Sequence, residues 1–113
     1  MANRNRTAGN AFELVIAKLL KPLFPMVKTS RYGSRELDAL KVDLMHTEPF
    51  NFQIKLTQQT PSVRLLDEMP DDKNINIIVW GKTEKADRYI MNKGNYAILK
   101  MDDLIKIIEV GIR

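Results

Sequence analysis

Residues 51–57 alternate strictly between apolar and polar side chains, and no other stretch constrains the fold as strongly. A period of two is typical of a β-strand that buries one face and turns the other toward solvent or a site. The polar face presents Gln53 and Lys55 next to each other, which raises the question of whether it is only solvated. The apolar members of this strand are Phe52, Ile54 and Leu56.

The composition predicts a soluble protein with a single domain over residues 1–113. Of its 113 residues, 44% are hydrophobic and 28% are charged, as is usual for a globular chain. No apolar run approaches the roughly 20 residues that a membrane span needs, and the N-terminus lacks the apolar core of a signal peptide. We therefore expect an intracellular protein with no membrane partner.

Two kinds of chemistry are excluded by the residue counts. The chain has no cysteine, so it has neither a disulfide framework nor a thiolate nucleophile. Its one histidine, His46, excludes a multi-histidine zinc site.

The spacing of apolar residues predicts the order of the elements. A first helix is expected from Asn10, which can form a capping box with Glu13, to about Pro22. The whole order predicts a mixed α/β fold in which helices flank a central mixed β-sheet. The later elements are a loop over 31–36, strands over 37–45, 51–57 and 75–81, a short helix over 62–69, a hairpin turn at 92–95 and a last helix capped by Asp102 or Asp103.

The strands over 37–45 and 51–57 are predicted to pair as an antiparallel hairpin, and the register decides which residues meet. In one register Asp43 lies opposite Gln53. Cross-strand neighbours are about 5 Å apart, so a carboxylate and an amide oxygen in these positions can bind one cation. A second register, with its turn near Met45 and His46, places Asp38 opposite Gln53 instead. Both registers remain open from the sequence.

With an acidic residue on the first helix, these positions resemble the site of the PD-(D/E)xK nucleases, and of their Holliday-junction resolvases in particular. The matching positions are Glu13 in GNAFELVIAKLL, Asp43 in KVDLM, and Gln53 with Lys55 in FQIK. The stretch SRYGSRE also resembles the Arg and Gly-Ser segment that precedes the catalytic Asp in such resolvases, and the resemblance spans residues 7 to about 81. It implies a restriction-endonuclease-like core and a metal-dependent endonuclease that cuts four-way DNA junctions, in the host cytoplasm if the enzyme is encoded by a phage.

The resemblance also implies a Mg²⁺ site, with Mn²⁺ as a substitute, and no small-molecule cofactor. Gln53 departs from the family, which has Glu or Asp there, but its amide oxygen can still coordinate Mg²⁺. Lys55 would orient the attacking water and stabilise charge on the phosphate. The expected catalytic residues are Glu13, Asp43, Gln53 and Lys55. The expected metal ligands are Glu13, Asp43, Gln53 and the Ile54 main-chain carbonyl, with Asp38 as the alternative to Asp43.

Positive charge supports DNA as the partner. The net charge is +4 and the pI is about 9.4, which is compatible with binding to a polyanion. Basic residues gather before the first helix and around the Gly-Ser segment, where they can contact phosphates. The expected DNA-binding residues are Arg4, Arg6, Lys28, Arg31, Ser34 and Arg35.

A junction is resolved by two symmetric cuts, so the resemblance further implies a C₂ homodimer. Apolar residues in the second half of the sheet are candidates for its interface. Two other functions stay open: a nuclease-fold DNA-binding module that has lost hydrolysis, with Gln53 as the trace of that loss, and a nicking or restriction-type endonuclease. The interface candidates are Ile75, Ile77, Ile78, Val79, Trp80, Ile98 and Leu99.

Overall fold

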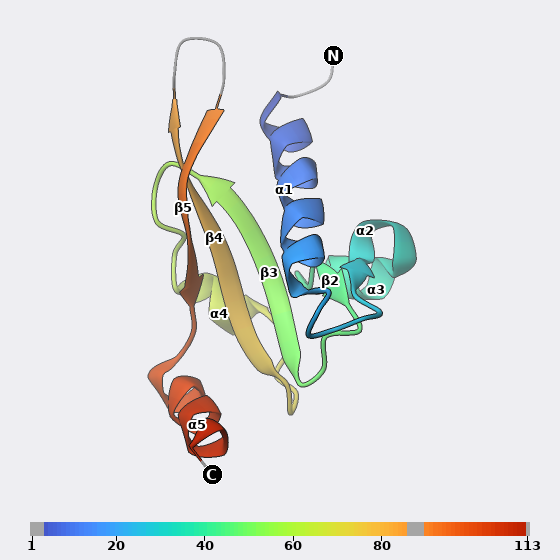
Figure 1. Cartoon of the computed structure of the whole chain (residues 1–113), viewed down its shortest axis with the longest axis vertical. Coiled ribbons are helices and arrows are strands. Elements are labelled where there is room, and N and C mark those ends of the chain that lie inside the picture. Colours follow the sequence, from blue (N-terminus) through green and yellow to red (C-terminus); the bar gives the residue numbers. More distant parts are fainter. Residues whose placement is uncertain (1–3, 86–89, 113) are drawn as a thin grey trace.

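The computed structural model describes residues 4–85 and 90–112, which form a mixed α/β fold (Figure 1). One sheet contains three strands, β3 (Phe50–Thr57), β4 (Ile75–Lys85) and β5 (Ile90–Ile98), in the order β3–β4–β5. β3 and β4 are parallel and β4 and β5 are antiparallel, so the predicted mixed sheet is confirmed. The strands predicted over 51–57 and 75–81 are confirmed as well.

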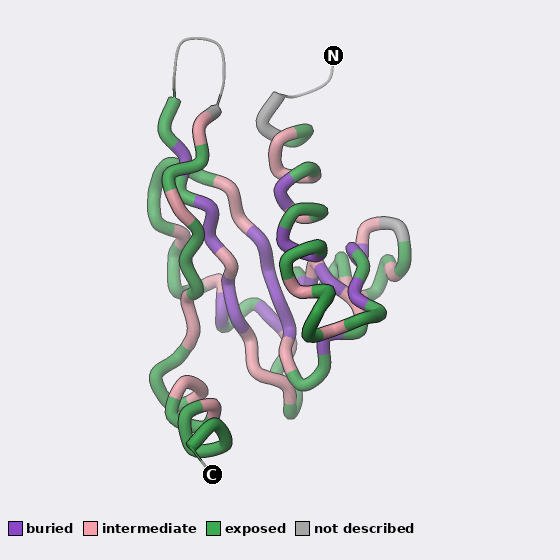
Figure 2. The backbone as a smooth tube through the Cα atoms, viewed as in Figure 1, coloured by how far each residue is buried: buried purple, intermediate pink, exposed green. Residues whose placement is uncertain are grey.

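Helices cover both faces of this sheet. α1 (Arg4–Leu20) packs on one face, and α4 (Arg64–Glu68), which connects the parallel strands, packs on the other (Figure 1). The alternation along β3 explains this layering, because one parity faces α1 and the other faces α4. The larger core, purple along α1, β3 and β4 in Figure 2, lies under α1. It contains Phe12, Ile16, Ala17, Val27, Leu44, Phe52, Ile54 and Ile77, and the smaller core contains Leu66, Met69 and Ile78.

The segment before β3 differs from the prediction. Two short helices replace the loop predicted over 31–36 and most of the strand predicted over 37–45. Ser34 is the physical reason, because its Oγ accepts a hydrogen bond from the backbone N of Leu37 at 3.2 Å and so caps the second helix. The elements are β1 (Lys28–Thr29), α2 (Ser30–Gly33), α3 (Arg35–Ala39) and β2 (Leu44–Met45), and β1 pairs with β2 in a separate antiparallel sheet.

The start of the first helix was placed too late by the capping-box pattern. α1 begins at Arg4, so Asn10 lies inside the helix. The Oδ1 of Asn10 accepts a hydrogen bond from Arg31 instead of capping the helix. The predicted capping box of Asn10 with Glu13 is therefore wrong.

The turn predicted at 92–95 is also wrong, because these residues continue β5. The pairing of β5 with β4 skips Lys93, which forms a bulge beside Gly94, whose φ is 145°. A bulge of this kind uses the conformational freedom of glycine that the sequence pattern had assigned to a turn. The segment that joins β4 to β5 is 86–89, outside the described residues.

The later helices form close to their predicted positions. α4 falls within the helix predicted over 62–69, and α5 (Met101–Gly111) begins at the residue before the predicted cap. Within the ranges given above, every helix is too short or too polar to cross a membrane.

A side chain at Gly81 on β4 would collide with the core under α1. A Cβ placed there would lie 2.6 Å from Cζ of Phe12 and 2.8 Å from Cδ1 of Leu56. We expect Gly81→Ala to lower the free energy of unfolding by about 1–3 kcal/mol, as overpacking does, in urea unfolding. Gly9→Ala in α1 is the matched control, because nothing lies within 4 Å of that position, and it should raise stability by about 0.5–1 kcal/mol. Equal stability of Gly81→Ala and the wild type would refute this account of the close approach.

Candidate active site at the free edge of strand β3

Asp43 closes the free edge of β3, on the side away from β4. Its backbone N donates to the Phe52 carbonyl at 2.8 Å, and the backbone N of Ile54 donates to its Oδ2 at 2.7 Å. In a regular antiparallel pair the Ile54 N–H would bond to a main-chain carbonyl. The carboxylate of Asp43 takes that position. The main-chain carbonyl of Asp43 accepts a hydrogen bond from the backbone N of Ser30 at 2.9 Å.

These bonds hold Asp43 beside Gln53. They do not form an antiparallel ladder, because β2 pairs with β1 and β3 pairs with β4, so the predicted hairpin of 37–45 with 51–57 is wrong. The second register, with Asp38 opposite Gln53, does not form either. Asp38 is exposed on α3, yet its negative charge still contributes to raising the pKa of Asp43. Asp38 therefore lies beside the site without facing Gln53 across the strand pair.

Arg31 holds Glu13 at the edge of this site. Its Nη2 lies 2.8 Å from Oε1 of Glu13, and its Nη1 donates to Oδ1 of Asn10. Asn10 and Glu13 are three positions apart on α1, so both face the guanidinium. The Arg31 and Glu13 side chains are only 24% and 12% exposed, which protects the pair from solvent. Arg31 is thus tied to α1, and its predicted contact with DNA stays a prediction.

The site concentrates negative charge where water is partly excluded. The pKa of Asp43 is raised from 3.8 to about 6. Burial is the main cause and the charges of Glu13 and Asp38 add to it, while the Ile54 N–H and the positive charge of Lys55 oppose the rise. Burial also raises the pKa of Glu13, against the hydrogen bond and charge of Arg31. The charge of Glu13 therefore acts on Asp43, and the charges of Asp38 and Lys55 act on both carboxylates.

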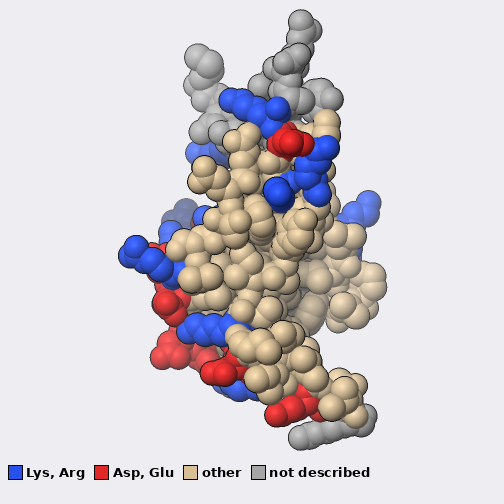
Figure 3. Space-filling model, turned by 90° about the vertical axis from the view of Figure 1, so that its left-hand side faces the viewer, with Lys and Arg blue, Asp and Glu red and all other residues tan. Residues whose placement is uncertain are grey.

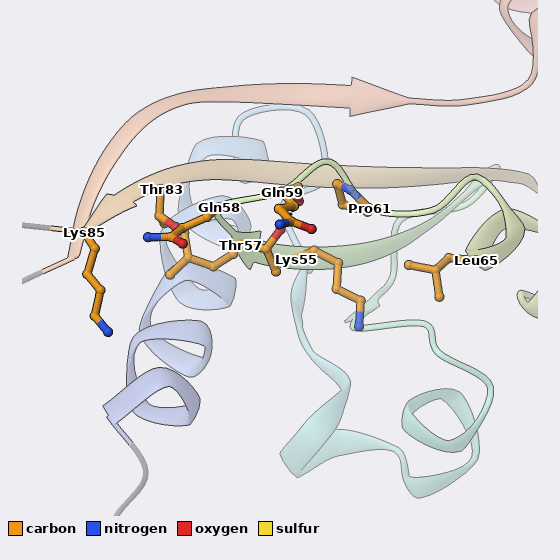
Figure 4. Close-up of a pocket in the computed structure, with 9 residues that line it drawn as sticks. Lys55, Thr57, Gln58, Gln59, Pro61, Leu65, Thr83 and Lys85 are labelled. Atoms are coloured by element: carbon orange, nitrogen blue, oxygen red, sulfur yellow. Dashed lines mark hydrogen bonds between the residues drawn. The ribbon is translucent and has the colours of Figure 1, made fainter.

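Gln53 brings an unusual feature to the same edge. Its side chain is 3% exposed, and its Oε1 is buried without a hydrogen-bond partner among the described residues. A buried polar atom without a partner costs about 1–3 kcal/mol, so natural proteins rarely keep one without a reason. Lys55 is two positions further on, and its amino group points from β3 toward the segment of α2 and α3 (Figure 4).

The oxygens at this edge are of the type that Mg²⁺ prefers, although few of them carry a negative charge. In the described part of the chain, no three His, Cys, Asp or Glu side chains group closely enough to hold a metal ion. The available donors are the Asp43 carboxylate, Oε1 of Gln53 and the Ile54 carbonyl, which faces the same edge as the Ile54 N–H. Glu13 would join them only in competition with Arg31.

The other predicted DNA-binding residues surround this edge in different ways. Arg6 on α1, Lys28 on β1 and Arg35 on α3 are exposed. Ser34 is a helix cap, as described above, and its Oγ is used within the chain. The side chain of Arg4 lies outside the described residues.

Two residues that the sequence pattern did not mark also build the site. Asn10 anchors Arg31, and Ser30, fully buried, donates from Oγ to the Val42 carbonyl at 2.6 Å and from N to the Asp43 carbonyl. Ser30 thereby fixes the backbone on both sides of Asp43. Its partners lie twelve and thirteen residues along the chain, so no local pattern identifies it.

Comparison with models of protein families, with curated protein sequences and with solved structures gave no match. The assignment of a function therefore depends on the site itself and on the resemblance of its residues to a nuclease site.

Asp43→Asn is expected to stabilise the protein at neutral and alkaline pH. The pKa of Asp43 is about 6 in the folded state against an ordinary value of 3.8, so the folded protein holds this proton more tightly than the unfolded chain does. The free energy of unfolding should therefore fall as the pH rises from about 4 to above 6, by up to roughly 3 kcal/mol. Asparagine keeps an oxygen for the Ile54 N–H but carries no charge, so the variant should be about 1–3 kcal/mol more stable at about pH 8 and similar to wild type near pH 4.

Urea unfolding at both pH values measures this difference. The exposed Asp71→Asn removes the same charge elsewhere and should change stability by at most about 0.5 kcal/mol at either pH. A loss of stability for Asp43→Asn at about pH 8 would show that the buried carboxylate is not a cost to the fold.

Proposed function

We propose that this protein is a metal-dependent DNA endonuclease that cuts branched DNA, with the four-way junction as its substrate. The observation that carries the proposal is the desolvated Asp43 carboxylate at the free edge of β3, on which the charges of Glu13 and Lys55 act. A cation bound at Asp43 would relieve its raised pKa. The resemblance to PD-(D/E)xK resolvases adds the reaction and the substrate class, and with them a cytoplasmic location.

The arrangement of the core supports this assignment. Glu13 comes from the helix that packs on the sheet, and Gln53 and Lys55 come from a strand of the sheet, as the order of motifs in a restriction-endonuclease-like core requires. Asp43 comes from the segment paired with that strand. The proposed core is thus α1, the edge segment with Asp43, β3 and β4.

Each side chain has a distinct task in the proposed reaction. Asp43, Gln53 and the Ile54 carbonyl would hold Mg²⁺ or Mn²⁺, and Glu13 would add its charge after exchange with Arg31. When bound, the metal supplies an acidified water and a Lewis acid for the phosphate. Lys55 stabilises the negative charge that develops on the phosphate oxygens. Arg6, Lys28 and Arg35 contact flanking phosphates.

A DNA-binding module without hydrolysis is the second candidate. Two observations favour it: Gln53 brings no charge to the site, and Arg31 already neutralises Glu13. Both lower the attraction of the site for a divalent cation. This candidate predicts that the protein binds a four-way junction and does not cut it in Mg²⁺ or Mn²⁺.

Asp43→Asn is expected to abolish cleavage while junction binding stays intact or becomes tighter. The substitution deletes a metal ligand, which should lower the cutting rate by roughly 10²-fold or more, and it removes a negative charge that repels phosphates. Cutting of a labelled four-way junction in Mg²⁺, beside linear duplex and single-strand controls, measures the rate. Fluorescence anisotropy in the absence of metal measures binding.

Asp71→Asn is the control for this experiment and should cut like the wild type. A normal rate for Asp43→Asn together with an inactive Asp38→Asn would move the metal ligand to Asp38. Wild-type protein that binds the junction and leaves it uncut would favour the second candidate.

The two-fold symmetry of a junction leads us to propose a C₂ homodimer as the active form. The sheet residues expected at its interface lie in or against the two cores of a single chain, so they are poorly suited to this role. α5 is better suited, because none of its residues is buried and a helix of 11 residues is marginal without a packing partner. Its exposed apolar side chains, with the residue after it, are Met101, Ile105, Ile108, Val110 and Ile112.

The neighbouring surface is consistent with this interface. β5 is the second edge strand of the sheet, and its side of the molecule is largely uncharged at its centre (Figure 3). Tyr96 on β5 is 50% exposed, and its ring centroid lies 5.3 Å from that of Trp80. Edge strands and uncharged patches of this kind favour contact with a second chain.

Replacing both Ile105 and Ile108 by lysine should convert a dimer into a monomer. The wild type is expected to sediment at about twice 13.0 kDa at micromolar concentration, and the double variant at about 13.0 kDa. Leu14→Lys is the control, because Leu14 is 60% exposed on α1, away from α5, and should leave the dimer intact. A monomeric wild type, with and without junction DNA, would favour a nicking nuclease over a resolvase.

A further inference from the structure

A groove of about 650 Å³ adjoins the candidate active site and shares Lys55 with it. It is lined by the end of β3, the turn that follows and the end of β4, with Lys85 toward one end (Figure 4). In Figure 4 the side chains of Lys55 and Lys85 both extend toward the lower side of the view. Among the described residues, none that lines the groove is acidic.

The two lysines set the charge of the groove and its length. In the described part of the chain neither forms an ion pair, and the nearby Glu84 is paired with Lys93 at 3.5 Å. Lys55 pairs with Trp80 in the parallel ladder, so Lys85 lies five strand residues further along. At the rise of a β-strand this is roughly 16 Å, which spans several successive phosphates of one strand.

The wall between the lysines is polar, uncharged and held in place. The Oγ1 of Thr57 donates to the Gln59 carbonyl at 2.7 Å, and Nε1 of Trp80 donates to the Thr57 carbonyl at 3.1 Å. These bonds fix the turn after β3 and leave the amide side chains of Gln58 and Gln59 exposed. Leu65 adds an apolar surface next to this turn.

We propose that this groove binds a segment of one DNA strand directly beside the scissile phosphate. Phosphates would contact Lys55 and Lys85, the amides of Gln58 and Gln59 would donate hydrogen bonds to the backbone between them, and Leu65 would pack against a sugar or base. A volume of about 650 Å³ suits such a segment and not a whole duplex. The inference rests on the proposed function and names the surface that orients its substrate.

Lys85→Ala, made in the Asp43→Asn background so that DNA is bound and not cut, tests the groove. Anisotropy with a labelled four-way junction over a salt series should show several-fold weaker binding and a slope of log K against log salt that is smaller by about 1. Lys73→Ala is the matched control, because Lys73 is exposed and lies outside the groove, and it should leave the slope unchanged. Equal losses in both variants would reduce the effect to general electrostatics and overturn the proposal.

A second arm locates the contact on the DNA. Single neutral methylphosphonates, placed in turn along the strand next to the cutting site, should weaken binding at one or two positions, and Lys85→Ala should add no further loss there. Additive losses at every position would overturn the proposal. An acidic peptide that competes for binding through Lys85 more strongly than a single strand of DNA would do the same.

The outcomes separate this inference from the function on which it rests. If wild-type protein cuts junctions and Lys85→Ala binds them normally, the groove is not used and the nuclease assignment stands. If the wild type cuts nothing but its binding depends on Lys85, the groove stands and the nuclease assignment falls. Absence of any DNA binding overturns both.

Discussion

The hydrogen bond from the Ile54 backbone to the Asp43 carboxylate is the interaction on which this edge of the protein depends. It ends the sheet, because a side chain and not a further strand satisfies the exposed N–H of β3. It also holds a carboxylate in a partly desolvated position, where it is costly to ionise. The bond therefore fixes the edge of the sheet and offsets part of the cost of burying the Asp43 carboxylate, and a cation could relieve the rest. Ser30 fixes the backbone around Asp43 by donating hydrogen bonds to the Val42 and Asp43 carbonyls.

Gln53 can be understood from the same charge balance. A glutamate at a position that is 3% exposed would bury another negative charge near Asp43, so its own pKa would rise and the protein would lose stability. Glutamine avoids that cost but leaves Oε1 without a partner. The chain thus exchanges electrostatic repulsion for a smaller penalty of one unpaired oxygen. Such a site would attract a metal ion less strongly than one with glutamate at this position.

The predictable parts of the structure are those fixed by local pattern. The strands over 51–57 and 75–81 follow from hydrophobic spacing. Alternating apolar residues indicate a strand buried on one face, and a continuous apolar run indicates a strand buried on both faces. The region over 37–45 was misread, since its apolar residues also fit a helix and the capping role of Ser34 depends on one hydrogen bond. The role of Arg31 was beyond any local pattern, because its partners on α1 lie 18 and 21 residues away and only tertiary packing brings them together.

The two carboxylates of the site, Glu13 and Asp43, differ in how well their negative charges are compensated. Glu13 has a guanidinium as its partner, whereas Asp43 has a backbone N–H and the more distant charge of Lys55. Asp43 is therefore the group with most to gain from a bound cation. Phosphates that approach Lys55 would draw on the same positive charge and leave Asp43 still less compensated. A cation that binds at Asp43 relieves both effects, so metal and DNA should each increase the affinity of the site for the other, by the same factor.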